Sequence, residues 1–379
     1  MLVPVTMPVA VLRGLVHDRF GVSELETSLF MSINMIGAAL AAPVMGLLLD
    51  RLERRKPVIV WATLIDAALF WAMTEAPTFG ALLSLRFVEG IAHIVALSAL
   101  LALAGDSRLG RGRAMGTAGT GITFGVGIGA PLGGVIGRTD PVAPLAAGAV
   151  VLLFVALAAA MLLPESAERR SRASFAEMVA AVRRHRALVV PLVFAFVDRF
   201  TTGFFTTTFS LYLRRVFELD PPRIGLLIAL FMLPFSLLSY PAGRLADRWS
   251  RTALMCGGSL VYGLATASLG WWSEGLLPVL MVVLGTSAAV MFVPSLVMTA
   301  DLSASETRAT GIAAFNAAGA LGFIAGPVTG GWISQTVAAG ATWVEGYRAA
   351  FVVAGVSELL CVLLFLPWLL RLRRQGLTT

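Results

Sequence analysis

The sequence has few charged residues. Lys, Arg, Asp and Glu together make up 13% of its 379 residues, whereas soluble globular proteins carry about 25%. Hydrophobic residues make up 58%, and the mean hydropathy is +0.85. So little charge does not form a water-facing surface, which excludes a soluble globular protein. Apolar runs of roughly 18–27 residues follow one another, each long enough to cross a hydrocarbon core of about 30 Å. We therefore predict a polytopic, all-α membrane protein.

Cysteine and histidine are scarce as well. The two cysteines, Cys256 and Cys361, lie inside apolar runs, and the three histidines, His17, His93 and His185, are far apart in the sequence. This spacing indicates neither a metal site nor a disulfide framework. The sequence also has no HExxH motif, no GxSxG motif and no phosphate-binding loop. We therefore predict neither an enzyme nor an ATP-driven pump, and no cofactor.

Positive charge exceeds negative charge. The formal net charge is +7 and the isoelectric point is near 10.4. The basic residues lie in short loops between apolar runs, where such residues orient helices in the membrane. The sequence has no basic strip with interleaved aromatic residues of the kind that binds single-stranded nucleic acid. We therefore expect a lipid bilayer, and no nucleic acid, as the partner of this charge.

Twelve apolar spans are predicted. They cover roughly residues 1–16, 27–49, 57–74, 78–104, 114–137, 142–163, 188–213, 223–243, 252–272, 276–300, 309–335 and 347–370. The one long hydrophilic connection between them predicts a six-helix bundle at 1–163, a linker at 164–187, a second six-helix bundle at 188–370 and a tail at 371–379. The first span is too short to cross the bilayer, so we expect the first helix to be truncated at its start.

The linker contains a helix signal. Ser174 and Glu177 form a capping-box pattern, and apolar residues on one side and arginines near the end follow them. This pattern predicts a short amphipathic helix on the membrane surface, with a disordered linker as the alternative.

The basic residues also predict the orientation of the chain. One set of alternate loops holds twenty Lys and Arg residues, and the other set holds seven. The richer side is cytoplasmic. We therefore expect a multi-pass protein of the cytoplasmic (inner) membrane, with the linker and both termini inside.

Two sets of residues recur at an offset of 197 positions. Gly46, Asp50, Arg51 and Arg54 recur as Gly243, Asp247, Arg248 and Arg251. The same offset carries Gly125, Gly129 and Gly133 onto Gly322, Gly326 and Gly330. One offset that serves two different signals indicates a duplicated half. A duplicated membrane bundle with its substrate site between the halves is a transporter architecture.

These segments resemble motifs of the major facilitator superfamily. The segment from Gly46 resembles that family's loop signature between helices two and three, and the segment from Gly243 resembles its echo between helices eight and nine. The segment 85–90, in which Arg86 precedes a glycine by four positions, resembles the fourth-helix motif. The resemblance extends over the whole chain apart from the start of the first helix. It implies two pseudo-symmetric six-helix bundles with twelve transmembrane helices.

A further motif bears on the branch of the family. Gly326-Pro327 followed by Gly330 resembles the family's glycine-proline motif, here in helix eleven. In export-type members that motif belongs in helix five, where this sequence has Pro131 one position late. Apart from this departure, the resemblance implies the branch of drug or metabolite:proton antiporters.

The repeated loop and the glycine rows have separate predicted roles. The resemblance implies that the charged loop residues Asp50, Arg51, Arg54, Asp247, Arg248 and Arg251, with Gly46 and Gly243, latch one conformation. Positive-inside anchoring is the alternative. The rows Gly125, Gly129 and Gly133, and Gly322, Gly326 and Gly330 with Pro327, each lie on one helical face, so we predict close helix packing there.

Three ionisable residues share one side of the fourth span. Arg86, Glu89 and His93 fall within about 60° of one another around a helix. A charge at membrane depth costs about 2.5–3.5 kcal/mol or more, so these groups should face a partner or a wet cavity. In the functional interpretation Arg86 holds an anion or biases the carboxylate, and Glu89 or His93 carries a proton. In the structural interpretation Arg86 and Glu89 form a permanent pair.

The seventh span carries a second pair, Asp198 and Arg199. Adjacent helical positions diverge by about 100°, so both side chains are not expected to face one point. We predict that Asp198 is a second proton site, with an interhelical salt bridge as the alternative. Asp66 and Glu358 are also deep in spans that, by the family resemblance, lie at the periphery. We expect these two acids to be neutral and bonded to a neighbour, or to pair with interior arginines. Asn34 and Asn316, the polar residues of spans two and eleven, are further pathway candidates, either as hydrogen-bond partners of a solute or, as the favoured alternative, of another helix.

We therefore predict a monomeric secondary transporter that moves a small organic solute by alternating access, coupled to protons, with efflux of drugs or metabolites favoured. The alternatives are a uniporter or an amphiphile carrier whose interior charges are structural, proton-coupled uptake of an organic anion, and a non-transporting sensor. Interior arginines favour an anionic or zwitterionic solute. The apolar Phe- and Met-rich stretches 204–235 and 281–298 favour a hydrophobic one.

Overall fold

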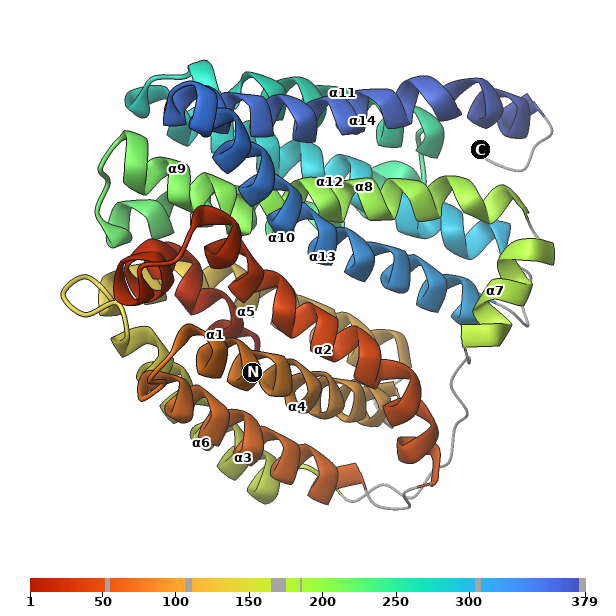
Figure 1. The fold of residues 1–379 in the computed structure, drawn as a ribbon. Coiled ribbons are helices and arrows are strands. Elements are labelled where there is room, and N and C mark those ends of the chain that lie inside the picture. The colour runs from red at the N-terminus through yellow and green to blue at the C-terminus, as the bar shows by residue number, and fades with distance from the viewer. Residues whose placement is uncertain (52–54, 106–110, 165–174, 185, 304–307, 375–379) are drawn as a thin grey trace. The chain divides into compact units, whose positions relative to one another are not determined.

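The computed structural model describes residues 1–51, 55–105, 111–164, 175–184, 186–303 and 308–374 (Figure 1). Within helices the side chains of residues 42–51, 111–120 and a few others lie outside that description. The chain divides into two compact units. The first unit holds residues 1–172 and 219–229, and the second holds residues 173–218 and 230–379.

Helices make up nearly all of the described residues, as the composition predicts. The α-helices of the first unit are α1 (Leu2–Thr6), α2 (Glu24–Arg51), α3 (Arg55–Thr74), α4 (Phe79–Gly105), α5 (Arg111–Ile136) and α6 (Ala143–Leu162). Those that follow along the chain are α7 (Phe175–Arg184), α8 (Val189–Thr206), α9 (Thr208–Val216), α10 (Pro221–Ala246), α11 (Arg251–Ser268), α12 (Leu277–Leu302), α13 (Arg308–Gly340) and α14 (Trp343–Arg374). Short tight helices η3 (Arg186–Leu188), η4 (Leu269–Trp271) and η5 (Glu274–Leu276) join some of them.

Nine helices within the described residues are long and apolar enough to cross a membrane. Two shorter apolar stretches, Leu2–Val11 and Gly121–Ile136, and the 28-residue α2 lie where the other predicted spans fall. Most observed helices begin and end within a few residues of the predicted spans. Long apolar runs define these helices because a bilayer requires every backbone group to be bonded within its own helix.

The first apolar segment is not a regular α-helix. The short α-helix α1 is followed by a 3-10 segment, η1 (Met7–Val11), and then by a π-helical segment, η2 (Arg13–Asp18). Pro8 is the second residue of η1 and has no backbone N–H for a helical bond. The sequence pattern predicts a simple short helix here, and the structure differs because prolines interrupt the hydrogen bonding.

The seventh span is interrupted as well. The sequence predicts one helix over 188–213, but the structure has α8 and α9 separated at Thr207, whose backbone φ of −132° and ψ of −76° are not helical. The hydroxyls of Thr206 and Thr207 both donate to the carbonyl of Gly203, at 2.9 and 3.1 Å. Such side-chain bonds compete with the helical ladder, which explains the break.

Equivalent helices pack in the same way within each unit. In the first unit α2 packs on α4, α3 packs on α4 and α6, and α5 packs on α1 and η1. In the second unit α11 packs on α12 and α14, and α13 packs on α8. A shift of 197 residues carries α3 onto α11, α6 onto α14 and α5 onto α13. The duplication in the sequence therefore extends to the helix pairs of each unit.

The glycine rows make very close contacts between helices of this kind. A Cβ on Gly129 would collide with the carbonyl oxygen of Val3, and one on Gly326 would collide with that of Phe200. Val3 and Phe200 are themselves 197 positions apart. Only glycine allows the backbones of α5 and α13 to approach their neighbours this closely.

The other members of both rows lie in similar contacts. Gly133 meets the backbone of Met7, and Gly330 meets the side chains of Thr208 and Phe204. The remaining contacts are those of Gly125 with Leu2, Gly322 with Phe196 and Pro327 with Gly203.

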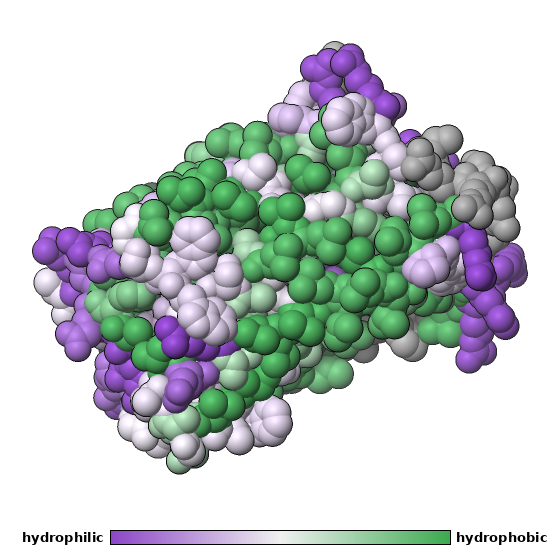
Figure 2. Space-filling view, turned by 90° about the horizontal axis from the view of Figure 1, so that it is seen from above, coloured by the Kyte–Doolittle hydropathy of each residue, from purple (hydrophilic) through white to green (hydrophobic). Residues whose placement is uncertain are grey.

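Large apolar side chains are exposed along many of the helices. Trp61 on α3, Phe154 on α6, and Leu264 on α11 are each at least 60% exposed. In Figure 2 hydrophobic residues cover most of the face in view, and hydrophilic residues gather in separate patches. A surface of this kind is matched to lipid, not water.

Candidate functional site

A buried ion pair lies on α4 in the first unit. Arg86 Nη1 is 3.2 Å from Glu89 Oε2, and neither side chain is exposed. Three residues of one helical turn separate them, so the helix itself brings the two side chains together. Arg86 Nη2 also donates to the carbonyl oxygen of Val5 at 3.4 Å. The pairing that the sequence predicts is therefore present, and it places a fixed positive charge beside the carboxylate.

Aromatic rings surround the Arg86 guanidinium. Its central carbon is 5.0 Å from the ring centre of Phe30 and 5.7 Å from that of Phe70. Phe30 lies on α2 and Phe70 lies on α3, so three helices enclose the charge. The rings stabilise the cation without offering it a hydrogen bond.

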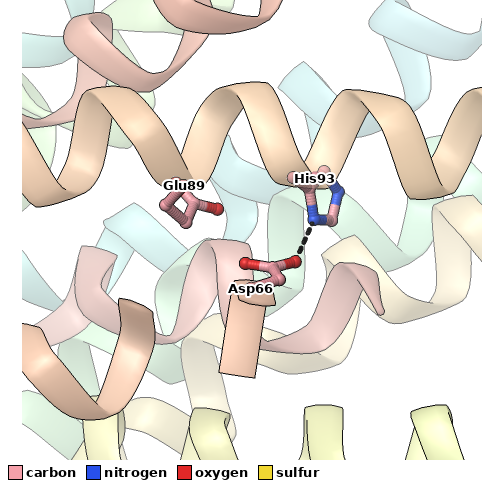
Figure 3. Close-up of side chains that lie close together, drawn as sticks. All are labelled: Asp66, Glu89 and His93. Atoms are coloured by element: carbon pink, nitrogen blue, oxygen red, sulfur yellow. Dashed lines mark hydrogen bonds and ion pairs between the residues drawn. The ribbon is translucent and has the colours of Figure 1, made fainter. Parts of the chain in front are cut away.

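A second buried pair joins α3 to α4. His93 Nδ1 is 3.0 Å from Asp66 Oδ2, and Asp66 is completely buried (Figure 3). Of the two kinds of partner expected for Asp66, a neighbouring side chain or an arginine, the structure shows a neighbouring side chain, because the side of α3 that carries Asp66 faces His93. His93 and Glu89 are four residues apart, so the two pairs occupy neighbouring positions on one face of α4.

Asn34 completes this group from α2. Its side-chain amide donates to Glu89 Oε2 at 3.4 Å, and the residue is buried. Glu89 Oε2 thus meets both Arg86 and Asn34. In contrast, Glu89 Oε1, Asp66 Oδ1 and His93 Nε2 are buried and have no hydrogen-bond partner within the described part of the chain. Buried polar atoms without partners are costly, and they are common where a ligand or proton binds.

The second unit carries an adjacent ion pair on α8. Arg199 Nη1 contacts Asp198 Oδ2 directly, although the two residues are adjacent. The expectation that the two side chains diverge was wrong, because the long arginine side chain folds back onto its neighbour. The Arg199 guanidinium also lies 4.3 Å from the ring centre of Phe292 on α12. Asp198 is 7% exposed.

Glu358 on α14 is the least satisfied acid of the second unit. It is fully buried, and neither carboxyl oxygen has a hydrogen-bond partner among the described residues. Ser259 and Thr201 lie beside it. However, the Ser259 hydroxyl is directed to the sulfur of Met291 at 3.5 Å and the Thr201 hydroxyl to a backbone carbonyl oxygen at 3.4 Å.

Tyr262 on α11 lies near both acids and was not singled out from the sequence. It is fully buried, its hydroxyl has no partner in the described residues, and Asp198 and Glu358 are its acidic neighbours. A tyrosine in an apolar span resembles any core aromatic, so only the packing of α11 on α14 reveals this position. By contrast, the predicted pathway residue Asn316 on α13 is exposed.

The two copies of the predicted latch differ in what the structure describes. The first copy is not described at the level of side chains. It consists of Gly46, Asp50, Arg51 and Arg54. In the second copy, Asp247 and Arg248 are exposed in the turn that ends α10. Arg251, at the first position of α11, contacts Asp301 at the end of α12. The second copy therefore links two helix ends by a surface ion pair.

The chain matches one family model along nearly its whole length. The model of the Major Facilitator Superfamily matches residues 2–210 and 192–378. The chain belongs to the major facilitator superfamily. It is thus a multi-pass membrane protein of a transporter family. Comparison with curated protein sequences finds no match.

Solved structures of other family members share the fold. A bacterial homologue of the human lysosomal transporter Spinster, inward-facing and unoccupied, is 15% identical, with a TM-score of 0.80 over 95% of this chain and 93% of that one. The nucleoside transporter NupG is 14% identical, with a TM-score of 0.76 over 97% of this chain and 98% of that one. A D-xylose-proton symporter is 15% identical, with a TM-score of 0.70 over 94% of this chain and 93% of that one. These likenesses confirm the predicted fold class.

Proposed function

We propose that the protein is a secondary active transporter that moves a small organic solute across the cytoplasmic membrane by alternating access. Transport is coupled to protons, and export of a drug or metabolite is the favoured direction. The observation that supports this proposal most directly is the buried carboxyl group of Glu89, which has one paired oxygen and one unpaired oxygen.

The chemistry of Glu89 suits a group that alternates between two protonation states. Its ionised form is stabilised by Arg86 at 3.2 Å and by the amide of Asn34 at 3.4 Å. Its free oxygen offers a position for a proton. Because a carboxylate at membrane depth is costly without partners, a modest movement of Arg86 would favour proton uptake. Loss of that proton would follow when the pair re-forms.

Asp198 offers a second such group in the other unit. It is almost completely buried and depends on one flexible partner, Arg199. A solute with a positively charged group that paired with the Asp198 carboxylate would exclude a proton from it. Solute and proton would then compete for one position, which is the coupling an antiporter needs. One structural relative is by name a proton symporter, and this supports the choice of coupling ion.

The test uses the purified protein in proteoliposomes that contain a pH-sensitive dye. A panel of fluorescent or radiolabelled solutes is added without an imposed gradient. We expect at least one solute to change the lumenal pH, and Glu89→Gln to abolish that change. Solute movement without any pH change, in the wild type as in Glu89→Gln, would instead establish a uniporter or amphiphile carrier.

A further inference from the structure

Asp66, Glu89 and His93 form a compact set of metal-ligand side chains within the first unit. One possible ligand atom from each lies within 4.8 Å of the others, and all three residues are buried. Figure 3 shows the Asp66 carboxyl group between Glu89 and His93, with the Glu89 oxygen directed toward it. Glu89 and His93 come from one face of α4, at the four-residue spacing that metal-binding helices use.

The unpaired atoms indicate that this set lacks a ligand. Asp66 Oδ1 and Glu89 Oε1 are buried and have no hydrogen-bond partner in the part of the chain that the structure describes. Both residues are completely buried. The other Glu89 oxygen faces Arg86, so the free oxygen remains available on the side of Asp66. Two orphan carboxylate oxygens and an imidazole in one place are what a bound cation would satisfy.

We propose that Asp66, Glu89 and His93 bind a divalent transition-metal ion of the Zn²⁺ or Co²⁺ type. Such an ion takes nitrogen and oxygen ligands at about 2.0–2.2 Å, which holds the ligand atoms roughly 3.3–3.5 Å apart. Side-chain shifts within the observed 4.8 Å spread are enough to reach that geometry. The ion would replace the hydrogen bond between His93 and Asp66, and a fourth position would remain open for water or an anion.

Nearby positive charge restricts the kind of ion. The Arg86 guanidinium lies 3.2 Å from a Glu89 carboxyl oxygen. Ions held only by charge, such as Ca²⁺, gain less here, because Arg86 already neutralises one of the two carboxylates. An ion that forms a strong bond to imidazole nitrogen overcomes this competition better. The site is thus expected to prefer Zn²⁺ and Co²⁺ to Ca²⁺ and Mg²⁺.

The sequence gives no sign of this site because its ligands come from two helices whose contact is set only by packing. The inference goes beyond the proposed function, since binding needs no transport. A failure of metal binding would leave proton coupling untouched, and the reverse also holds.

The test is a titration of the untagged, detergent-purified protein with Co²⁺ alone, followed by absorption spectroscopy. We expect one equivalent to give the intense visible bands of low-coordinate cobalt, and Zn²⁺ to remove them. Asp66→Asn and Glu89→Gln should each weaken binding by at least about tenfold, because even outer-shell changes at metal sites cost 10- to 100-fold. Glu358→Gln, which removes a buried acid from the second unit, should leave binding unchanged.

A variant that gains a new absorption band distinguishes loss of the metal site from misfolding. His93→Cys replaces imidazole with a thiolate ligand and should add a sulfur-to-cobalt charge-transfer band. The wild type should lack that band, because none of its three proposed ligands is a thiol. The proposal is overturned if wild-type protein leaves the Co²⁺ spectrum that of the hydrated ion. It is also overturned if the bands are the same in Asp66→Asn and Glu89→Gln, or if folded His93→Cys shows no charge-transfer band.

Discussion

Buried charge is the dominant feature at the scale of single residues. Arg86, Glu89 and Asp66 are 0% exposed, in a chain that surrounds them with apolar helices. Charges in such positions are retained only when partners offset the cost of removing them from water. In the first unit Arg86 and Asn34 are partners of one Glu89 oxygen, whereas the other Glu89 oxygen and one Asp66 oxygen have no partner among the described residues. That incomplete satisfaction is what makes the group a candidate for binding protons or ions.

The Arg86–Glu89 pair gives a prediction about stability. Arg86→Gln should lower the free energy of unfolding by about 3–5 kcal/mol, because it leaves the Glu89 carboxylate buried without its ionic partner. The double variant Arg86→Gln with Glu89→Gln should recover most of this loss, since no buried charge remains. Unfolding in detergent by denaturant measures both. As a matched control, Asp18→Asn breaks the partly exposed pair with Arg13 at 3.5 Å and should cost less than about 1 kcal/mol. Equal losses in the single and double variants would show that Arg86 does not act through Glu89.

Residue contacts were predictable from the sequence only where one helix provides both partners. The three-residue spacing of Arg86 and Glu89 is sufficient to predict their pairing. The Asp66–His93 contact was not predictable, because it depends on how α3 is rotated against α4. The Arg199 contact with its neighbour was missed for a different reason, the length and flexibility of the side chain. Cβ directions alone do not determine where a guanidinium lies.

At the scale of helices, the glycine rows allow α5 and α13 to pack closely on their neighbours. Gly129 on α5 and Gly326 on α13 each lie against a backbone carbonyl group of another helix. This role follows from the sequence, since a four-residue glycine repeat marks one helical face. The sequence did not predict the breaks in the first and seventh spans. Apolar patterning does not show that proline lacks a backbone donor or that threonine hydroxyls bond to the backbone.

The glycine contacts predict a large difference between similar substitutions. Gly326→Leu and Gly129→Leu should each destabilise the protein by about 1–3 kcal/mol or more, because the side chain has no space between the helices. Gly257→Leu on α11 should be tolerated, because nothing lies within 4 Å of a Cβ at that position. The thermal unfolding midpoint of each purified variant is the readout. A destabilised Gly257→Leu, or an unaffected Gly326→Leu, would be inconsistent with this account.

The Arg251–Asp301 contact provides a prediction about the latch. This ion pair is partly exposed, so Arg251→Gln and Asp301→Asn should change stability by less than about 1 kcal/mol. If the pair holds one conformation, both variants should nevertheless alter the transport rate, and the double variant should match either single one. Initial rates in proteoliposomes and unfolding midpoints, measured on the same preparations, separate the two effects. Unchanged rates in both variants would restrict the pair to anchoring.

At the scale of the whole molecule, the sequence was most informative. The alternation of apolar runs, the offset of 197 residues and the loop signatures led to the fold class that the family match and the solved relatives confirm. These features are visible in the sequence because a chain in a bilayer has far fewer possible backbone structures than a chain in water. Substrate, direction and coupling depend on a few side chains, for which hydrophobic patterning carries no information.

The distribution of basic residues predicts how the molecule is oriented. Both termini should be cytoplasmic. Green fluorescent protein fused after Thr379 should therefore fluoresce, and alkaline phosphatase fused there should be inactive. A phosphatase fusion after Asp140, in the turn between α5 and α6, should be active. The opposite pattern of fusion activities would reverse the proposed orientation.

The central claim is that proton movement through Glu89 and Asp198 drives solute transport. The most direct test compares two activities in proteoliposomes, accumulation of a solute driven by an imposed pH gradient and exchange of labelled for unlabelled solute without a gradient. The wild type should perform both. Glu89→Gln and Asp198→Asn should retain exchange and lose accumulation, because the carrier still moves but no longer binds the proton. Undiminished accumulation in both variants would contradict the account.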